Sequence, residues 1–205
     1  MRIVRSLVVA IVFLAGCSSL DLTTTTTTTV TKAVTVVNGH VIEPGTNLGH
    51  ADLSNANLSG ENMKGVDLMY AELSGAILYN ADLTDACLYG ADLSFANLSY
   101  ANLTNADLHD AEMDHARLSN ANLTKALLWD VMLEYADLSN ANLTGASFSG
   151  ATLTEANLSG ANLTGAILAN AVLVGANLTG ANLTGARLEL ADLRGATMPD
   201  GSVND

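Results

Sequence analysis

Two groups of side chains in this sequence could do chemistry. The first is a run of imidazole and carboxylate groups near the middle of the chain, which comprises His109, Asp110, Glu112, Asp114 and His115. Nitrogen and oxygen donors of these types bind divalent cations when they converge on one point. We expect these five side chains to lie on the outside of a convex rod, where neighbouring side chains diverge. They are therefore weak metal candidates, and we expect neither a metal site nor a cofactor.

The second group is the thiol of Cys17 with the residues before it. A basic opening precedes the apolar run Leu7–Phe13, and this run is too short to cross a bilayer. The start of the chain is therefore typical of a secretory signal. The ending Leu14-Ala15-Gly16-Cys17 resembles the lipobox of bacterial lipoproteins, which implies cleavage before Cys17 and acylation of its thiol and its new amino group. The alternatives are an ordinary cleaved signal or a short buried helix, in both of which the position of Cys17 is incidental.

A five-residue phrase organises most of the chain. Residues 51–55 read Ala-Asp-Leu-Ser-Asn, and this template continues to Gly195 without an insertion or deletion. Every fifth residue from Leu48 to Met198 is Leu, Met or Phe, which gives 31 consecutive central positions. A period of five fits neither a flat strand nor an amphipathic helix. It is typical of a solenoid, in which stacked coils share one apolar core.

The phrase resembles the pentapeptide-repeat family. The resemblance implies an all-β fold, a right-handed quadrilateral β-helix of about seven to eight coils in which four pentapeptides make one coil. The central residue and the alanine two positions earlier would then point inward, and the other three positions outward. Leu beside Ala fits a narrow bore, and each buried Leu contributes about 1.5–3 kcal/mol. The Asn, Asp, Ser, Thr and Gly residues suit tight turns.

Five segments follow from these patterns. We expect a signal peptide over residues 1–16, the lipidated cysteine and a threonine-rich tether over 17–32, a capping strand or hairpin over 33–46, the repeat over 47–198, and a tail over 199–205. Asn38-Gly39 between two β-prone runs is a strong hairpin signal. The short tail leaves the C-terminal edge poorly covered, so end-to-end association at that coil remains open.

Rare outward side chains align when one coil takes 20 residues. Met69, Tyr89, His109 and Trp129 share one column, Phe95, His115 and Tyr135 share another, and Tyr70, Tyr79 and Tyr100 lie in the same coils. Exposed apolar patches mark interaction surfaces, and aromatic residues anchor interfaces. We therefore predict a partner-binding surface of Tyr89, His109, Trp129, Phe95, His115 and Tyr135. The alternative to partner binding is that the stacked rings only stabilise neighbouring strands.

The charge is strongly negative and unevenly distributed. The chain has 21 acidic and 8 basic residues, which makes direct binding to nucleic-acid phosphates improbable. Most carboxylates of the repeat lie at or before Asp137. Beyond that point, one side presents a nearly uncharged lattice of Asn and Thr. This lattice resembles those of ice-binding β-helices, although tandem duplication of one phrase explains it more simply.

A filled rod without inserted loops offers no pocket, and no nucleophile has a base at a suitable spacing, so we predict that the protein is not an enzyme. We expect a lipid-anchored scaffold in the bacterial cell envelope. It would be exported, would lie on the cell membrane or outer membrane facing the periplasm or exterior, and would bind a protein or an envelope polymer through its surface.

The family resemblance also gives an alternative. Some pentapeptide-repeat proteins are acidic rods that resemble duplex DNA and inhibit type II topoisomerases. The repeat here has about one net charge per 3 Å, against one per roughly 1.7 Å for duplex DNA. It also lacks the loop interruptions and the C-terminal dimerisation helix that are typical of those relatives.

Overall fold

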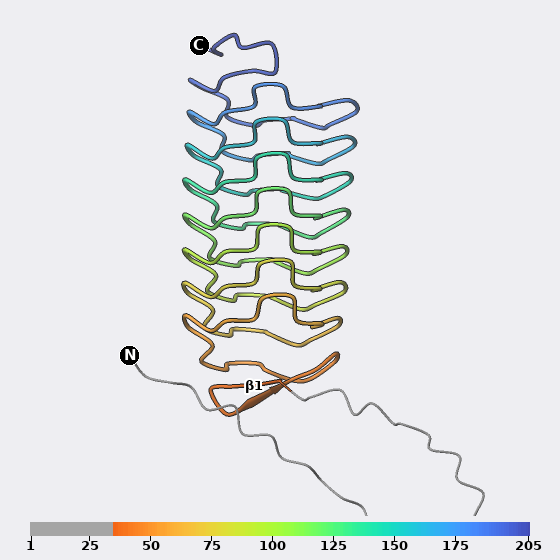
Figure 1. Cartoon of the computed structure of the whole chain (residues 1–205). Coiled ribbons are helices and arrows are strands. Elements are labelled where there is room, and N and C mark those ends of the chain that lie inside the picture. Colours follow the sequence, from red (N-terminus) through yellow and green to blue (C-terminus); the bar gives the residue numbers. More distant parts are fainter. Residues whose placement is uncertain (1–34) are drawn as a thin grey trace, which may run out of the picture.

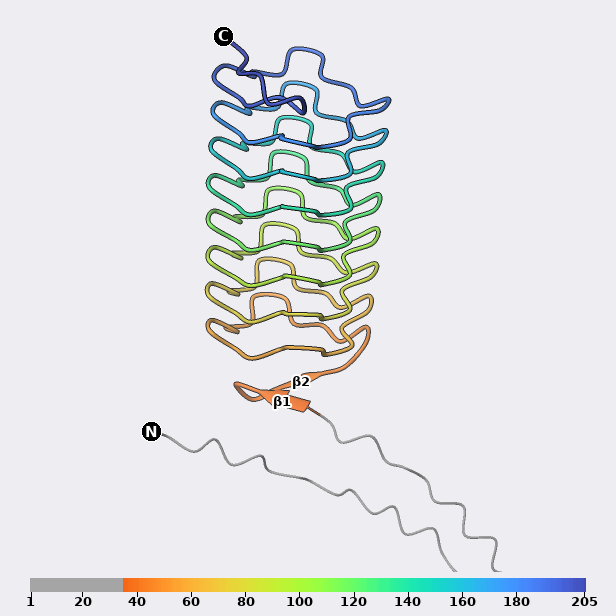
Figure 2. The same cartoon turned by 45° about the horizontal axis from the view of Figure 1, so that its top comes forward.

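The structure, a computed structural model, describes residues 35–205 and shows a straight stack of coils (Figures 1 and 2). A short hairpin lies at one end of the stack, and the C-terminus lies at the other. The predicted signal peptide, Cys17 and the tether over 17–32 fall outside the described residues. Within residues 35–205, no helix is long and apolar enough to cross a membrane.

Parallel backbone bridges join each coil to the next, 20 residues further along the chain. Four columns of bridges start at the pairs Asn47–Asp67, Asp52–Glu72, Asn57–Ile77 and Asn62–Asp82. Each bridge involves one residue from each coil, and a coil has four such bridged sides. The sides are therefore too short to form regular β-strands. The Leu48 N–H donates to the Asp67 carbonyl at 2.7 Å, and the Asp67 N–H donates to the Thr46 carbonyl at 3.0 Å. Backbone hydrogen bonds therefore place each residue above the one 20 positions earlier.

The corners between sides are tight turns that repeat every five residues. At a typical corner the Ala56 N–H donates to the Leu53 carbonyl at 3.0 Å, and Asn55 between them has φ of 56°. The last residue of every pentapeptide from His50 to Gly195 has such a positive φ. This left-handed region favours Gly, Asn and Asp. Corner geometry therefore explains why those residues are frequent at the fifth position.

The outward polar residues also have structural roles. The carboxylate or amide before a central residue accepts a hydrogen bond from the N–H two residues later, as Asp52 does from Ser54 at 3.0 Å. On the Asn and Thr side, the Thr124 hydroxyl donates to Asn122 at 2.6 Å, and the Asn122 amide donates to the Thr104 hydroxyl of the preceding coil at 2.8 Å. The uncharged lattice is thus a network of hydrogen bonds between coils.

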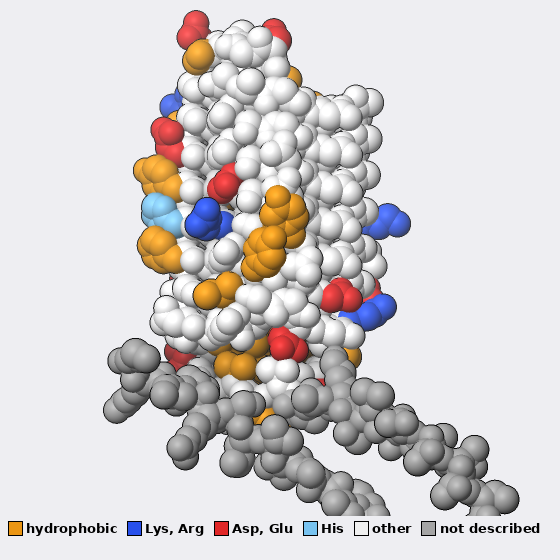
Figure 3. Space-filling view, in the orientation of Figure 1, with side chains coloured by type: hydrophobic (Ala, Val, Ile, Leu, Met, Phe, Trp, Pro, Cys, Tyr) orange, Lys and Arg blue, Asp and Glu red, His pale blue; other side chains and the backbone are white. Residues whose placement is uncertain are grey.

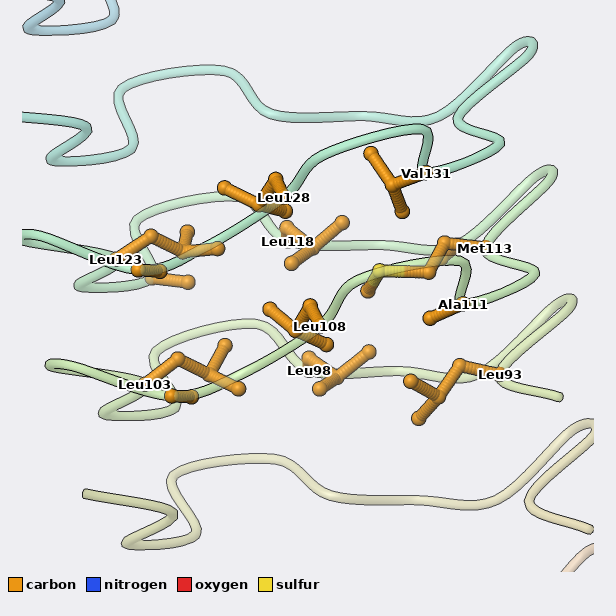
Figure 4. Close-up of a cluster of buried hydrophobic side chains, with 14 of the residues drawn as sticks. Leu93, Leu98, Leu103, Leu108, Ala111, Met113, Leu118, Leu123, Leu128 and Val131 are labelled. Carbon is orange, nitrogen blue, oxygen red and sulfur yellow. The ribbon is translucent and has the colours of Figure 1, made fainter. Parts of the chain in front are cut away.

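The bore is filled by the residues that the repeat predicts. Central Leu and Met side chains stack on those of neighbouring coils, and the alanines fill the space between them (Figure 4). Leu98, Leu118 and Met113 in this cluster are completely buried. Phe148 is the largest fully buried side chain and occupies a central position that is otherwise Leu or Met. A single continuous apolar core therefore runs along the rod.

A β-hairpin covers the N-terminal end of the core. Strand β1 (Thr35–Val37) pairs antiparallel with β2 (His40–Ile42), and Asn38-Gly39 forms the two-residue turn that their sequence predicts. Thr35 Oγ1 donates to Glu61 at 2.9 Å, and the Asn38 amide donates to the Asp52 carbonyl at 3.2 Å. Ile42 is buried against the first coil. The hairpin therefore shields one edge of the sheets from solvent.

The C-terminal end is covered on one side only. Thr197 pairs antiparallel with Val203, and the Asn204 N–H donates to the Ala196 carbonyl at 2.8 Å, so the tail folds back on the last coil. The expectation of a poorly covered edge is therefore wrong for this side, because seven residues suffice to reverse the chain and pair once. The other three sides have no such cover within residues 35–205. Leu183, Leu188 and Leu193 are accordingly only partly buried.

Truncation of a central leucine in the middle of the stack should destabilise the protein strongly. Leu123→Ala removes a fully buried side chain, so we expect the free energy of unfolding to fall by about 2–5 kcal/mol. Leu190→Ala is the control, because Leu190 is 84% exposed, and should change it by less than about 0.5 kcal/mol. Chemical denaturation followed by circular dichroism measures both. Equal effects would contradict the role of the central positions.

Candidate interaction surface

Aromatic rings form a ladder along one corner of the rod. This first ladder consists of His50, Tyr70, Tyr89, His109 and Trp129, whose successive ring centroids lie 5.3, 5.2, 5.8 and 4.6 Å apart. His50 and Tyr70 are stacked, and the other three pairs are edge-to-face. The predicted residues Tyr89, His109 and Trp129 are therefore brought together, with His109 in contact with the rings of the coils on both sides of it.

The sequence pattern places Met69 in this column, but the ladder passes through Tyr70, the next residue at the same corner. Gly90 lies one coil above Tyr70, and a Cβ atom at Gly90 would come within 2.6 Å of the Tyr70 ring. The absence of that side chain leaves room for the ring to reach Tyr89. The alignment of columns at intervals of 20 residues does not place Tyr70 and His50 in this ladder. For Tyr70, the glycine at position 90 is a sequence signal that could have indicated its place.

A second ladder occupies the neighbouring corner. Phe95, His115 and Tyr135 are stacked almost parallel, with centroid distances of 4.8 and 5.1 Å and interplanar angles of 8° and 7°. Phe95 is 63% exposed and Tyr135 is 55% exposed. At the left edge of the rod, Figure 3 shows hydrophobic side chains stacked above and below a histidine, in the order of this ladder. The three residues predicted from the sequence thus form one exposed stack.

The backbone of the second ladder is strained. Phe95, His115 and Tyr135 have φ of 60°, 58° and 58°, in the region where L side chains are disfavoured. Each such residue costs roughly 1–2 kcal/mol, whereas each aromatic pair contributes about 0.5–1.5 kcal/mol. The strain of three residues is at least as large as the gain from two pairs. The same φ occurs at every corner, including those at Tyr100, Lys125 and Leu190, so the strain belongs to the corner geometry and the stacking offsets only part of it.

Carboxylates lie between the two ladders. We call the strip that spans both corners over four coils the ladder face; it comprises residues 69–75, 89–95, 109–115 and 129–135. Its middle column runs through Glu72, Asp92 and Glu112, which occupy successive bridges. Asp110, Asp114, Asp130 and Glu134 add four more carboxylates at the corners. The ladder face has no Lys or Arg, so it is both aromatic and strongly acidic.

Hydrogen bonds fix several of these side chains. His109 Nδ1 lies 3.0 Å from Asp107 Oδ1, and the Trp129 indole N–H donates to Ser147 Oγ. Asp114 Oδ1 accepts the N–H of Glu134 in the next coil at 2.8 Å. The rings of the first ladder are therefore held in place by the polar groups around them.

The weak metal candidates do not converge. His109 and Asp110 belong to the first corner, Glu112 lies on the side between, and Asp114 and His115 belong to the second corner. In the part of the chain that the structure describes, no three His, Cys, Asp or Glu side chains gather as cation ligands would. These five residues contribute instead to the two ladders and to the acidic strip.

Tyr79 and Tyr100 form a separate pair. Their rings lie 5.5 Å apart in an edge-to-face contact, at a corner outside the ladder face. Figure 3 shows a hydrophobic patch in the middle of the visible side, apart from the stack at its edge. This pair offers a matched control, because it is exposed and aromatic but lies away from the acidic strip.

The environment of Tyr89 perturbs its phenol. A side-chain hydrogen bond with Tyr70 and the charge that Tyr70 acquires on ionising, together with the Asp110 carboxylate, raise the pKa of Tyr89 to about 12. Tyr70→Phe removes the largest of these causes, so we expect the highest tyrosine transition to move down towards 10. Ultraviolet absorbance of the phenolate measures it. Tyr79→Phe should leave that transition in place, and an unchanged transition in Tyr70→Phe would show that the two phenols do not interact.

Removing one ring from the second ladder should have little effect on stability. Tyr135→Gly loses one stacked pair but relieves a positive φ, so we expect the free energy of unfolding to change by no more than about 1 kcal/mol. Thermal unfolding followed by circular dichroism tests this. A loss of several kcal/mol would mean that the ladder exists to stabilise the coils.

Comparison with known proteins identifies the repeat. The model of the family described as pentapeptide repeats matches the chain in eight copies, over residues 46–85, 86–124, 121–160, 133–170 and 156–195. None of the curated proteins matches the sequence.

Solved structures are also similar to this chain. HetL, a pentapeptide repeat protein involved in heterocyst differentiation regulation from the cyanobacterium Nostoc sp. strain PCC 7120, is 38% identical, and the match covers 78% of this chain and 86% of HetL with a TM-score of 0.44. A trypsin-treated form of QnrB1, a plasmid-mediated fluoroquinolone resistance protein, is 25% identical over 69% of this chain and 76% of its own, with a TM-score of 0.56. Pentapeptide repeat proteins fold as right-handed quadrilateral β-helices and are generally non-catalytic scaffolds. On the match of its repeat to the family model, the chain belongs to the pentapeptide repeat family.

Proposed function

We propose that this protein is a lipid-anchored interaction scaffold of the bacterial cell envelope, which presents the ladder face to a protein partner. The observation that carries the proposal is the second ladder, where three exposed aromatic residues are stacked in register beside the carboxylates of the middle column. Exposed apolar side chains that gather in one patch mark interaction surfaces. The lipobox-like ending at Cys17 supports the anchor.

The ladder face has the properties of an interface. Aromatic side chains are enriched at interface centres because they bury large areas with few torsions to fix. Here the stacked neighbours already hold Phe95, His115 and Tyr135 in one arrangement, so binding would cost little additional side-chain entropy. Met132, which is 39% exposed, continues the middle column above Glu112 and adds apolar area between the ladders.

The position of the ladder face also fits an anchored rod. Its first coil follows soon after the hairpin, which lies at the N-terminal end of the rod (Figure 1) and precedes the repeat in the sequence, as Cys17 does. A partner bound to the ladder face would therefore sit on the half of the rod nearest to the anchor. The C-terminal half, with its hydrogen-bonded Asn and Thr side, would project away from it.

An acidic DNA mimic that inhibits a type II topoisomerase is the alternative. The fold likeness to QnrB1, whose name describes fluoroquinolone resistance, favours it. The distribution of charge opposes it, because 14 of the 17 carboxylates of the repeat lie at or before Asp137. Duplex DNA instead presents uniform charge along its length. An export signal would also separate the protein from a cytoplasmic topoisomerase.

The anchor is tested by lipid labelling in intact bacteria. We expect the full chain to incorporate a labelled fatty acid and to fractionate with membranes, and Cys17→Ser to lose both properties. Cys87→Ser is the matched control, because Cys87 is the other cysteine of the chain and lies within the repeat. An unlabelled, cytoplasmic full chain would overturn the anchor, and inhibition of topoisomerase supercoiling would then be the next assay.

The surface is tested by cross-linking and affinity purification from intact cells. A variant carrying both Trp129→Ser and Tyr135→Ser removes one ring from each ladder and should lose the specific partner. A variant carrying both Tyr79→Ser and Tyr100→Ser removes the separate aromatic pair and should keep it. If the first variant recovers the same proteins as the parent, the ladder face is not the binding surface.

A further inference from the structure

We propose that the partner binds the ladder face through an extended segment rich in Arg and Lys. This inference rests on the proposed function and adds the chemistry of the partner. It stands on two features that coincide on one side of the rod, the exposed aromatic ladders and the carboxylates between them. Each feature alone is common on protein surfaces, whereas their combination matches the requirements of a basic side chain.

The charges on this face are not neutralised within the described chain. Glu72, Asp92 and Glu112 stack at the usual strand spacing of about 4.8 Å, and like charges at that distance destabilise neighbouring strands. The Lys and Arg side chains that form ion pairs in residues 35–205 contact Asp85, Glu189 and Asp192, all outside the ladder face. Cations supplied by a partner would relieve this repulsion.

The rings determine which cations fit best. Guanidinium and ammonium groups are attracted to aromatic faces within about 6 Å, and Arg also stacks on them through its planar group. In the edge-to-face pairs of the first ladder, the ring planes of Tyr89, His109 and Trp129 lie 78–82° apart. The rings therefore do not cover one another's faces as they do in the second ladder. A basic side chain over the middle column would have carboxylates below it and rings on both sides.

The dimensions favour a short, extended segment. The ladder face spans four coils, so its ends lie three strand spacings, or about 14 Å, apart along the rod. Four or five residues of extended chain cover that distance at about 3.3 Å per residue. A straight rod offers such a segment a flat path parallel to its axis.

Other occupants fit less well. A second copy of this chain carries the same excess of 21 acidic over 8 basic residues and would be repelled. Nucleic acid is excluded for the same reason. A single metal ion lacks converging ligands among the described residues. The charge of the face therefore selects a cationic polypeptide.

Fluorescence of Trp129 provides a direct test, because it is the sole tryptophan of the chain and lies on the ladder face. The probe is a synthetic peptide of about eight residues in which Arg and Ser alternate, titrated into the full chain in detergent micelles. We expect a saturable change in fluorescence that weakens as salt is added. The same peptide with Glu in place of Arg should cause no change.

Matched charge variants separate specific binding from general attraction. A variant carrying Asp92→Asn and Glu112→Gln removes two charges from the middle column, and we expect affinity for the Arg peptide to fall by about tenfold or more. A variant carrying Asp82→Asn and Asp85→Asn removes two charges elsewhere, at positions where the next coil has Asn102 and Asn105. It should stay within about twofold of the parent. Circular dichroism and thermal unfolding must match the parent for both variants.

The outcomes are distinguishable from failure of the proposed function. Absence of saturable binding, or equal weakening in both charge variants, would overturn the basic-segment proposal. The Arg peptide could show no saturable binding while the variant carrying Trp129→Ser and Tyr135→Ser still loses its partner in cells. The ladder face would then remain the interaction surface, and its partner would have another chemistry. If Cys17→Ser leaves lipid labelling unchanged, the anchor fails while the peptide result keeps its meaning.

Discussion

The 20-residue register of the backbone hydrogen bonds is the constraint on which the whole structure depends. Each side of a coil bonds to the same side of the next through a single bridged residue and its neighbours. Because the register does not change from Asn47 to Thr197, any side chain is followed by its column neighbour at the strand spacing. The apolar core, the Asn and Thr network and the aromatic ladders are all consequences of this repetition.

Much of this could be predicted from the sequence because period five ties each position to one environment. The inward Leu and Ala and the stack Phe95–His115–Tyr135 follow from this spacing, and the hairpin at Asn38-Gly39 follows from its turn residues. Spacing does not give side-chain direction, so the choice of Tyr70 over Met69 depends on the open position at Gly90. The reversal of the tail, which brings Val203 back to Thr197, lies beyond the repeat, where no periodic signal exists.

The corners explain where variation is tolerated. The buried Leu and Ala of the core stabilise the fold. Outward residues therefore need only adopt the backbone conformation of the turn. Gly and Asn do this with little strain, and most corners beyond Tyr135 have them. Glu155 and Leu190 are the corners in that half that carry neither Gly nor Asn. In the four adjacent coils of the ladder face, aromatic and acidic residues replace Gly and Asn at most corners.

That departure has two energetic costs, of which a bound cationic partner would relieve the repulsion between carboxylates. Left-handed φ angles at Phe95, His115 and Tyr135 and the stacked carboxylates at Glu72, Asp92 and Glu112 both oppose folding. The core tolerates them because its contribution is distributed over many coils and does not depend on any one corner. A cationic segment would neutralise the carboxylates and cover the rings in a single contact. In this proposal the rod would provide rigidity, and the aromatic and acidic residues of the ladder face would provide the free energy of recognition.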